Sequence, residues 1–150
     1  MVRTTRPGYI KAALNEVGWI EDEVVAAGHL RQGRGGFLGG FADMLPTPSK
    51  KLPRQFLLAL TGTEVLVFKT TEVGGQEGAA MSWIKILEGV AFRCPIESVS
   101  ISALEDGEKS RGATLTIEGE SFPVLQAIRE GDPNTEPLFA MLMQRSAAVA

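Results

Sequence analysis

The chain of 150 residues has a single cysteine and a single histidine, and both shortages exclude classes of protein. Cys94 alone cannot form an intramolecular disulfide, which argues against a disulfide-stabilised secreted module. His29 alone excludes a metal site built from several histidines. The first residues also lack the unbroken apolar segment of a secretory signal. We therefore expect the chain to fold in a reducing compartment, the cytoplasm.

Long apolar runs are missing as well. A membrane-spanning helix needs about 20 consecutive apolar residues. The longest candidate run, between Gln55 and Phe68, is interrupted by the polar stretch at 61–64. We expect no membrane-spanning segment, and peripheral contact with a membrane surface is the only membrane association left open.

Strong positive charge is absent from the chain as a whole, since the net charge is −3. This balance disfavours general nucleic-acid binding, which needs a concentrated basic surface. Trp19 and Trp83 are isolated in the sequence and predict no stacking platform for single-stranded nucleic acid. The charges are nevertheless uneven, because residues 1–54 hold eight Lys/Arg against five Asp/Glu and residues 55–150 hold seven against thirteen. The basic side chains therefore favour the first third of the chain.

Catalytic motifs are lacking too. The stretch QGRGGFLGGF at 32–41 has five glycines, but Leu38 stands where the GxGxxG loop requires a third glycine, and the GxxxxGK[ST] spacing is absent. His29 is expected to be a structural or rim residue, and Cys94 a buried, inert thiol. The acidic residues at 105–108 are expected to form a solvated turn. We expect no enzyme, no metal and no cofactor. An enzyme with a pocket inside the fold would need convergent polar groups that a sequence does not reveal.

The remaining composition, 44% apolar and 22% charged, is that of one globular domain. Helical spacing of apolar residues predicts a short amphipathic helix over 9–17 that stops at Gly18 and packs against Trp19 and Ile20. β-Rich runs follow at 23–31, 54–61 and 63–71, the last two forming a hairpin. Residues 82–93 predict one bent strand or two short ones, with Gly89 at the bulge or break.

Strict alternation of apolar and small polar residues marks strands at 98–103 and 114–118, and a further strand is expected over 121–126. A C-terminal helix is predicted from Asn134 or Thr135 through Gln144. Its apolar stripe, which should dock on the sheet, consists of Leu138, Phe139, Leu142 and Met143. The sequence thus predicts a mainly β fold: an antiparallel barrel or sandwich of about seven strands, closed by a C-terminal helix and preceded by an extra N-terminal helix.

This arrangement resembles the pleckstrin-homology (PH) superfold, and three local patterns are similar to small bacterial PH-like domains. They are the hairpin LPRQFLLALTGTEVLVFKTT at 52–71, the segment FRCPIESVSI at 92–101 and the hairpin ATLTIEGESFPV at 113–124. The resemblance spans about Glu23 to Gln144 and leaves the N-terminal helix outside it. It implies an N-terminal extension over 1–22, a PH-like domain over 23–146 and a tail over 147–150.

PH-like domains are binding modules, and the resemblance implies a non-enzymatic protein without fixing its ligand. In the lipid-binding members of the superfold, basic residues around the first inter-strand loop hold the head group. The matching region of this chain contains Arg31, Arg34, Lys50, Lys51 and Arg54. Lys51 and Arg54 are three positions apart and do not reproduce the basic-x-Arg pair of those members.

Three large apolar residues in the same long connection add a second way of binding. Loops seldom carry such side chains without burying them against something. The three residues are Phe37, Leu38 and Phe41. They either fold back onto the domain or form an apolar anchor beside the basic residues. We expect contact with a partner protein, or with a second copy of the chain, as the leading function. Peripheral binding to anionic lipid head groups through the basic residues is the alternative.

Overall fold

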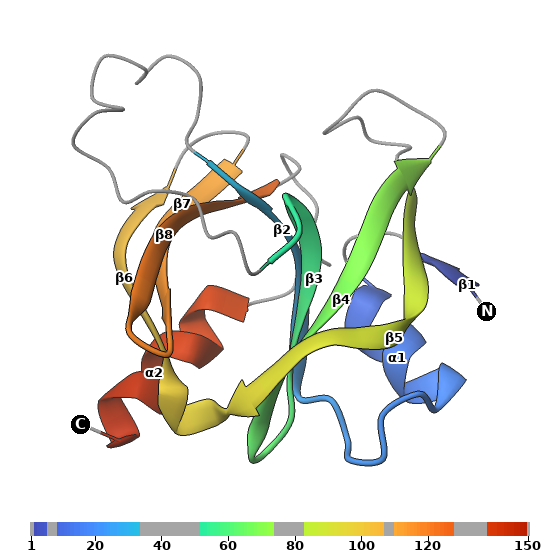
Figure 1. Cartoon of the computed structure of the whole chain (residues 1–150), viewed down its shortest axis with the longest axis horizontal. Helices are drawn as coiled ribbons and strands as arrows, with labels where there is room; N and C mark the ends of the chain where they lie inside the picture. The colour runs from blue at the N-terminus through green and yellow to red at the C-terminus, as the bar shows by residue number, and fades with distance from the viewer. Residues whose placement is uncertain are drawn as a thin grey trace.

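A computed structural model describes residues 2–5, 9–33, 52–73, 83–106, 110–127 and 138–149. Eight strands form one sheet in the order β1-β5-β4-β3-β2-β8-β7-β6, and all neighbouring strands are antiparallel (Figure 1). The strands are β1 Val2–Thr5, β2 Ala26–Gln32, β3 Gln55–Leu60, β4 Glu64–Val73, β5 Trp83–Pro95, β6 Val99–Asp106, β7 Ser110–Ile117 and β8 Glu120–Ala127. The helices are α1 Ile10–Val17, the short 3₁₀ turn η3 Ile96–Ser98 and α2 Leu138–Val149.

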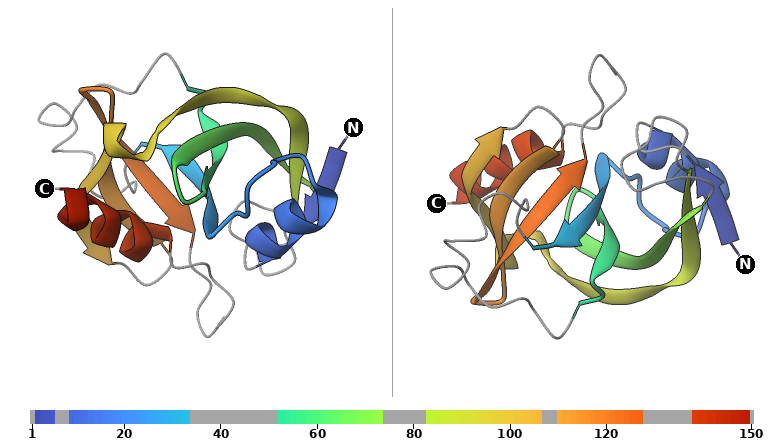
Figure 2. Two further views of the ribbon diagram at one scale, coloured as in Figure 1. Left: turned by 90° about the horizontal axis from the view of Figure 1, so that it is seen from below. Right: turned by 90° about the horizontal axis from the view of Figure 1, so that it is seen from above.

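The sheet folds over on itself at β2. Only the last two residues of this strand, Arg31 and Gln32, pair with β8. The halves β2–β5 and β6–β8 therefore diverge and enclose a core with α2 (Figure 2). Apolar side chains from both halves and from the helix meet there, among them Leu30, Phe56, Val67, Leu115, Phe122 and Phe139. The mainly β fold with a terminal helix is confirmed, and the order of β2 to β8 is consistent with a PH-like sandwich.

A second apolar cluster covers the opposite face of the first half of the sheet. Alternate strand residues point to opposite faces, so Ala26 joins the first core while Ala27 joins the second. The helix α1 contributes Ile10 and Leu14 to this second cluster and lies on the side of the sheet away from α2 (Figures 1 and 2). The first half of the sheet is thus buried on both faces, which accounts for the unbroken apolar run of β3.

The predicted N-terminal helix is confirmed as α1. It ends at Gly18, whose φ of 75° suits glycine and whose N–H donates to the carbonyl of Leu14 at 3.3 Å. Trp19 and Ile20 pack on the second cluster as expected. The indole of Trp19 lies against the ring of Phe68, with centroids 6.3 Å apart.

The strand β1 was not predicted, and it makes eight strands where the sequence predicted about seven. It adds to the outer edge of β5, where Val2 pairs with Leu87 and Thr5 with Ile84. β5 itself is a single long strand with two register shifts against β4, and one of them spans Gly89, which has a φ of 111°. The bulge predicted at this glycine is confirmed.

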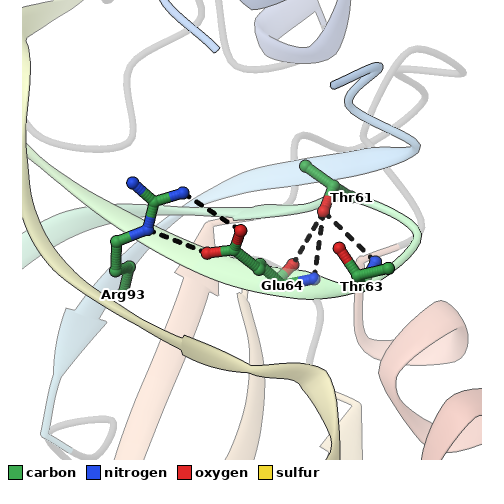
Figure 3. A network of polar contacts seen from close by, with 4 residues as sticks. All are labelled: Thr61, Thr63, Glu64 and Arg93. Carbon is green, nitrogen blue, oxygen red and sulfur yellow. Dashed lines mark hydrogen bonds and ion pairs between the residues drawn. The ribbon is translucent and has the colours of Figure 1, made fainter. Parts of the chain in front are cut away.

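The turn between β3 and β4 is fixed by a threonine (Figure 3). The Oγ1 atom of Thr61 accepts the backbone N–H groups of Thr63 at 3.3 Å and Glu64 at 3.0 Å. The Glu64 carboxylate in turn accepts two hydrogen bonds from Arg93 of β5, at 2.8 and 3.0 Å. This ion pair is solvent-exposed and lowers the pKa of Glu64. Its contribution to stability is small because water screens it.

The helix α2 docks with Leu138, Phe139 and Leu142 buried, as predicted, but Met143 is 45% exposed. Its prediction as a buried residue is wrong. With about 100° of rotation per residue, the buried face centres between Leu138 and Phe139, and Met143 falls about 90° from that centre. The helix also extends to Val149, past the predicted end at Gln144. Its predicted start lies in 128–137, outside the described residues.

Close packing at Gly28 of β2 brings α2 and β8 together. A β-carbon at this position would lie 2.9 Å from Leu138 Cδ2 and 2.9 Å from Gln126 Nε2. Such distances require a neighbour to move. The absence of a side chain at Gly28 therefore allows the helix to sit directly over the strand.

Candidate functional site

The predicted basic and apolar residues fall mostly outside the described residues. Arg31 lies half-buried near the end of β2, and Arg54 lies exposed just before β3. Because Arg31 pairs with Gln55, the two arginines occupy the same end of the sheet. The others lie in undescribed segments: Arg34, Phe37, Leu38, Phe41, Lys50 and Lys51. A site in the first inter-strand connection therefore stays a prediction.

The outer edge of β6 is a second candidate, which the sequence did not predict. In the described part of the chain β6 pairs with β7 alone, and it ends the strand order. The carbonyl of Ser98 accepts the N–H of Glu118 at 2.9 Å, next to the first strand pair of this hairpin. Since hydrogen-bonded pairs alternate along antiparallel strands, the backbone groups of Val99 and Ile101 point away from β7. The N–H of Val99 donates to the carbonyl of Ile96 at the end of η3. The carbonyl of Val99 and the N–H and carbonyl of Ile101 therefore form the open row of backbone groups.

A β-bulge limits this open row. Ser102 pairs with Thr114 and Glu105 with Gly112, so β6 has one residue more than its neighbour over this step. Two residues of β6, 103 and 104, lie within this step. The first is Ala103, whose φ of 54° is in the left-handed region that alanine rarely adopts. Bulges bend edge strands and stop uncontrolled pairing. The strained alanine therefore ends a short edge that remains regular from Val99 to Ser102.

Exposed apolar groups lie on β6 and on the helix that packs against it. In the described residues, four large apolar side chains are exposed, and two of them are Leu104 of β6, at 38%, and Met143 of α2. The exposed side chains of this region also include three glutamates, namely Glu97, Glu105 and Glu118. The β6 edge, defined as the outer side of 99–104 with Met143, thus combines open backbone groups, apolar contacts and negative charge.

Cys94 lies on β5 and His29 on β2, so neither belongs to the β6 edge. Cys94 is 4% exposed and free, and burial raises the pKa of its thiol to about 11, assisted by Glu118 and Glu64. The predicted burial of this thiol is confirmed, and at neutral pH it is protonated and weakly nucleophilic. His29 is half-buried on β2, where burial first and Arg31 second lower its pKa to about 4.

A metal site and a membrane-spanning helix were sought in the described ranges. They contain no group of three or more His, Cys, Asp or Glu side chains placed to hold a metal ion. Within the same ranges no helix is long and apolar enough to cross a membrane.

Comparison with models of known protein families gave no match, and a search of curated proteins gave none either.

Proposed function

We propose that the chain is a non-enzymatic, PH-like binding module that takes up an extended segment of a partner protein along the β6 edge. The observation that carries the proposal is the open row formed by the carbonyl of Val99 and both backbone groups of Ile101. Leu104 is exposed on the same strand, and Met143 is exposed on the helix that packs against it. An extended peptide adds to such an edge by main-chain hydrogen bonds, while neighbouring side chains give specificity. The free, buried Cys94 fits a reducing compartment such as the cytoplasm.

The energetic case rests on apolar contact as well as on hydrogen bonds. Each backbone hydrogen bond contributes only about 1 kcal/mol net, since water is displaced from both partners. Burying the remaining exposed area of Leu104 and Met143 adds to this, because apolar surface leaves water. The short regular edge thus favours a modest, reversible contact rather than a permanent one.

Charge favours a different protein over a second copy of this chain. If two β6 strands paired antiparallel, the exposed glutamates at the ends of the edge, Glu97 and Glu105, would be brought near the same residues of the other copy. Like charges close together across a strand pair are unfavourable. A segment with Lys or Arg at these flanks would instead gain from the three exposed glutamates. We therefore propose a basic, extended segment as the binding partner.

The experiment compares two substitutions at apolar side chains of equal exposure. Leu104 and Val90 are both 38% exposed, but Val90 lies on β5 and not on the β6 edge. Purified wild type, Leu104→Lys and Val90→Lys would be immobilised and used to capture proteins from the extract of the native cell. We expect a specific protein to bind wild type and Val90→Lys and to be lost with Leu104→Lys.

Two outcomes would contradict the proposal. Equal capture by both variants would place the contact elsewhere, and failure of wild type to retain any protein would remove protein binding as the function. Circular dichroism and thermal melting of the three proteins show that each variant is folded.

Binding to anionic lipid head groups is a second candidate, favoured by one observation. Arg31 and Arg54 lie at the same end of β2 and β3, next to the connection that holds the other predicted basic residues. Co-sedimentation with vesicles containing phosphatidylserine should require the anionic lipid, weaken as salt is raised and fall with Arg54→Glu. Binding that Arg54→Glu leaves unchanged would contradict this candidate.

A further inference from the structure

Of the four buried side-chain polar atoms without a hydrogen-bond partner in the described part of the chain, two belong to the first half of the sheet. They are Nε2 of His29 on β2 and Oγ1 of Thr70 on β4. Thr70 is only 7% exposed. An unpartnered polar group in such a place typically costs about 1–3 kcal/mol, and most buried polar groups therefore have a partner, often a bound molecule.

Strand register places these two groups on the face that α1 covers. His29 is opposite Leu57, and Thr70 is opposite Ile86, and both apolar partners belong to the second apolar cluster. Cross-strand partners share a face of the sheet. His29 and Thr70 therefore share a face with each other, on the side of the sheet away from α2.

Two further polar residues, Arg31 and Gln55, lie on the same face next to His29 and Thr70. Arg31 is opposite Gln55. The β3–β4 register, in which Phe56 is opposite Lys69, places Gln55 opposite Thr70 at the next step. Adjacent strands are about 4.8 Å apart, so the side chains of Arg31, Gln55 and Thr70 form one row across three strands. His29 is two residues from Arg31 along β2 and forms a hydrogen bond with Gln55.

This polar row, defined as His29, Arg31, Gln55 and Thr70, has the chemistry of an oxyanion site. The guanidinium supplies positive charge and N–H donors, and the hydroxyl of Thr70 and the amide of Gln55 each supply a further donor. The proximity of Arg31 is independently visible in its electrostatic effect on His29. None of these four residues is acidic, so the row itself presents no negative charge to an anion.

We propose that the polar row binds a small oxyanion, a carboxylate or phosphate group, on the face of the sheet that α1 covers. Arg31 provides the charge, and Thr70 donates the hydrogen bond that its hydroxyl lacks in the free protein. The imidazole of His29, held by its hydrogen bond with Gln55, lies beside the anion and reports its binding. Charge-assisted hydrogen bonds of this kind are the stronger class in proteins. This site is separate from the β6 edge and does not depend on the proposed function.

The single histidine makes the test direct, because its imidazole gives the only histidine signal in an NMR spectrum. Wild-type protein at pH 7 would be titrated with sodium phosphate and, separately, with sodium acetate, at an ionic strength held constant with sodium chloride. The proposal predicts a saturable shift of the His29 Cε1–H signal with at least one oxyanion. The arm that saturates at lower concentration distinguishes a phosphate from a carboxylate ligand.

Thr70→Val removes the unpartnered hydroxyl with little change of shape, and Thr114→Val on β7 is the control in the other half of the sheet. We expect Thr70→Val to weaken the oxyanion affinity about tenfold, which corresponds to about 1.4 kcal/mol. Arg31→Gln should weaken it at least as much, while Thr114→Val should bind like the wild type.

Four results would overturn the proposal. The first is a shift that sodium chloride alone reproduces. The second is a response that never saturates, which would mean that bound water satisfies these groups. The third is an affinity unchanged by Thr70→Val. A ligand-free Thr70→Val protein that melts below the wild type would also contradict it, since removing an unpartnered buried hydroxyl should stabilise the free protein.

Discussion

Acid should destabilise this protein through His29. Burial and the positive charge of Arg31 lower the pKa of this imidazole from its ordinary 6.5 to about 4, against a raising effect of the Gln55 hydrogen bond. The unfolded chain therefore binds a proton near pH 6.5, whereas the folded chain resists it until about pH 4. Between these two values the unfolded state holds more protons, so the free energy of unfolding falls as pH falls.

The size of this effect follows from the two pKa values. The stability that the neutral imidazole provides is complete above pH 6.5. Linkage predicts a loss of about 2 kcal/mol by pH 5 and about 3 kcal/mol by pH 4. These losses are large beside the total stability of a small domain, which is about 5–15 kcal/mol.

The assay is urea unfolding of wild type and His29→Gln at pH 7, 6, 5 and 4, with an NMR titration of the imidazole alongside. Carboxylates titrate in both proteins, so their effects cancel in the difference between wild type and variant. We expect wild type to lose stability relative to His29→Gln as the pH falls. An imidazole that titrates near 6.5 in the folded protein, or a difference independent of pH, would refute the reasoning.

Three further predictions concern the packing and the backbone. Gly28→Ala should cost about 1–3 kcal/mol in urea unfolding, because its methyl group meets Leu138 of α2 at 2.9 Å; a neutral effect would contradict the close approach. Ala103→Gly should stabilise by up to about 1 kcal/mol by relieving the left-handed φ, whereas Ala91→Gly, at an exposed position with ordinary φ, should destabilise; equal effects would argue against strain. Thr61→Val should cost about 1–3 kcal/mol, since two turn amides lose their acceptor; an unchanged melting temperature would show that water replaces the hydroxyl.

Local signals in the sequence predicted the elements that local chemistry decides. The stop of α1 follows from Gly18, and the bend of β5 follows from Gly89, both at positive φ. The turn between β7 and β8 also has positive φ at both central residues, Glu118 at 51° and Gly119 at 85°, as a two-residue hairpin loop requires. Alternation along β6 and β7 identified both strands because one of their faces meets solvent.

Properties that depend on the whole topology could not be predicted in the same way. β1 has only four residues and no periodic pattern, and its strand conformation comes from pairing with β5. The alternation over 98–103 marks a strand equally well in the middle of a sheet or at its edge, so it did not reveal the open side of β6. The polar row likewise depends on register across three strands, which brings Thr70 opposite Gln55 although 14 residues separate them.

The most direct test of the proposed binding mode is backbone hydrogen exchange in the complex with the captured partner. If the partner adds a strand to β6, the amide of Ile101 should exchange more slowly in the complex than in the free protein. The same slowing should occur with Val90→Lys and should be lost with Leu104→Lys. Protection confined to other strands, with the β6 amides unchanged, would contradict the account.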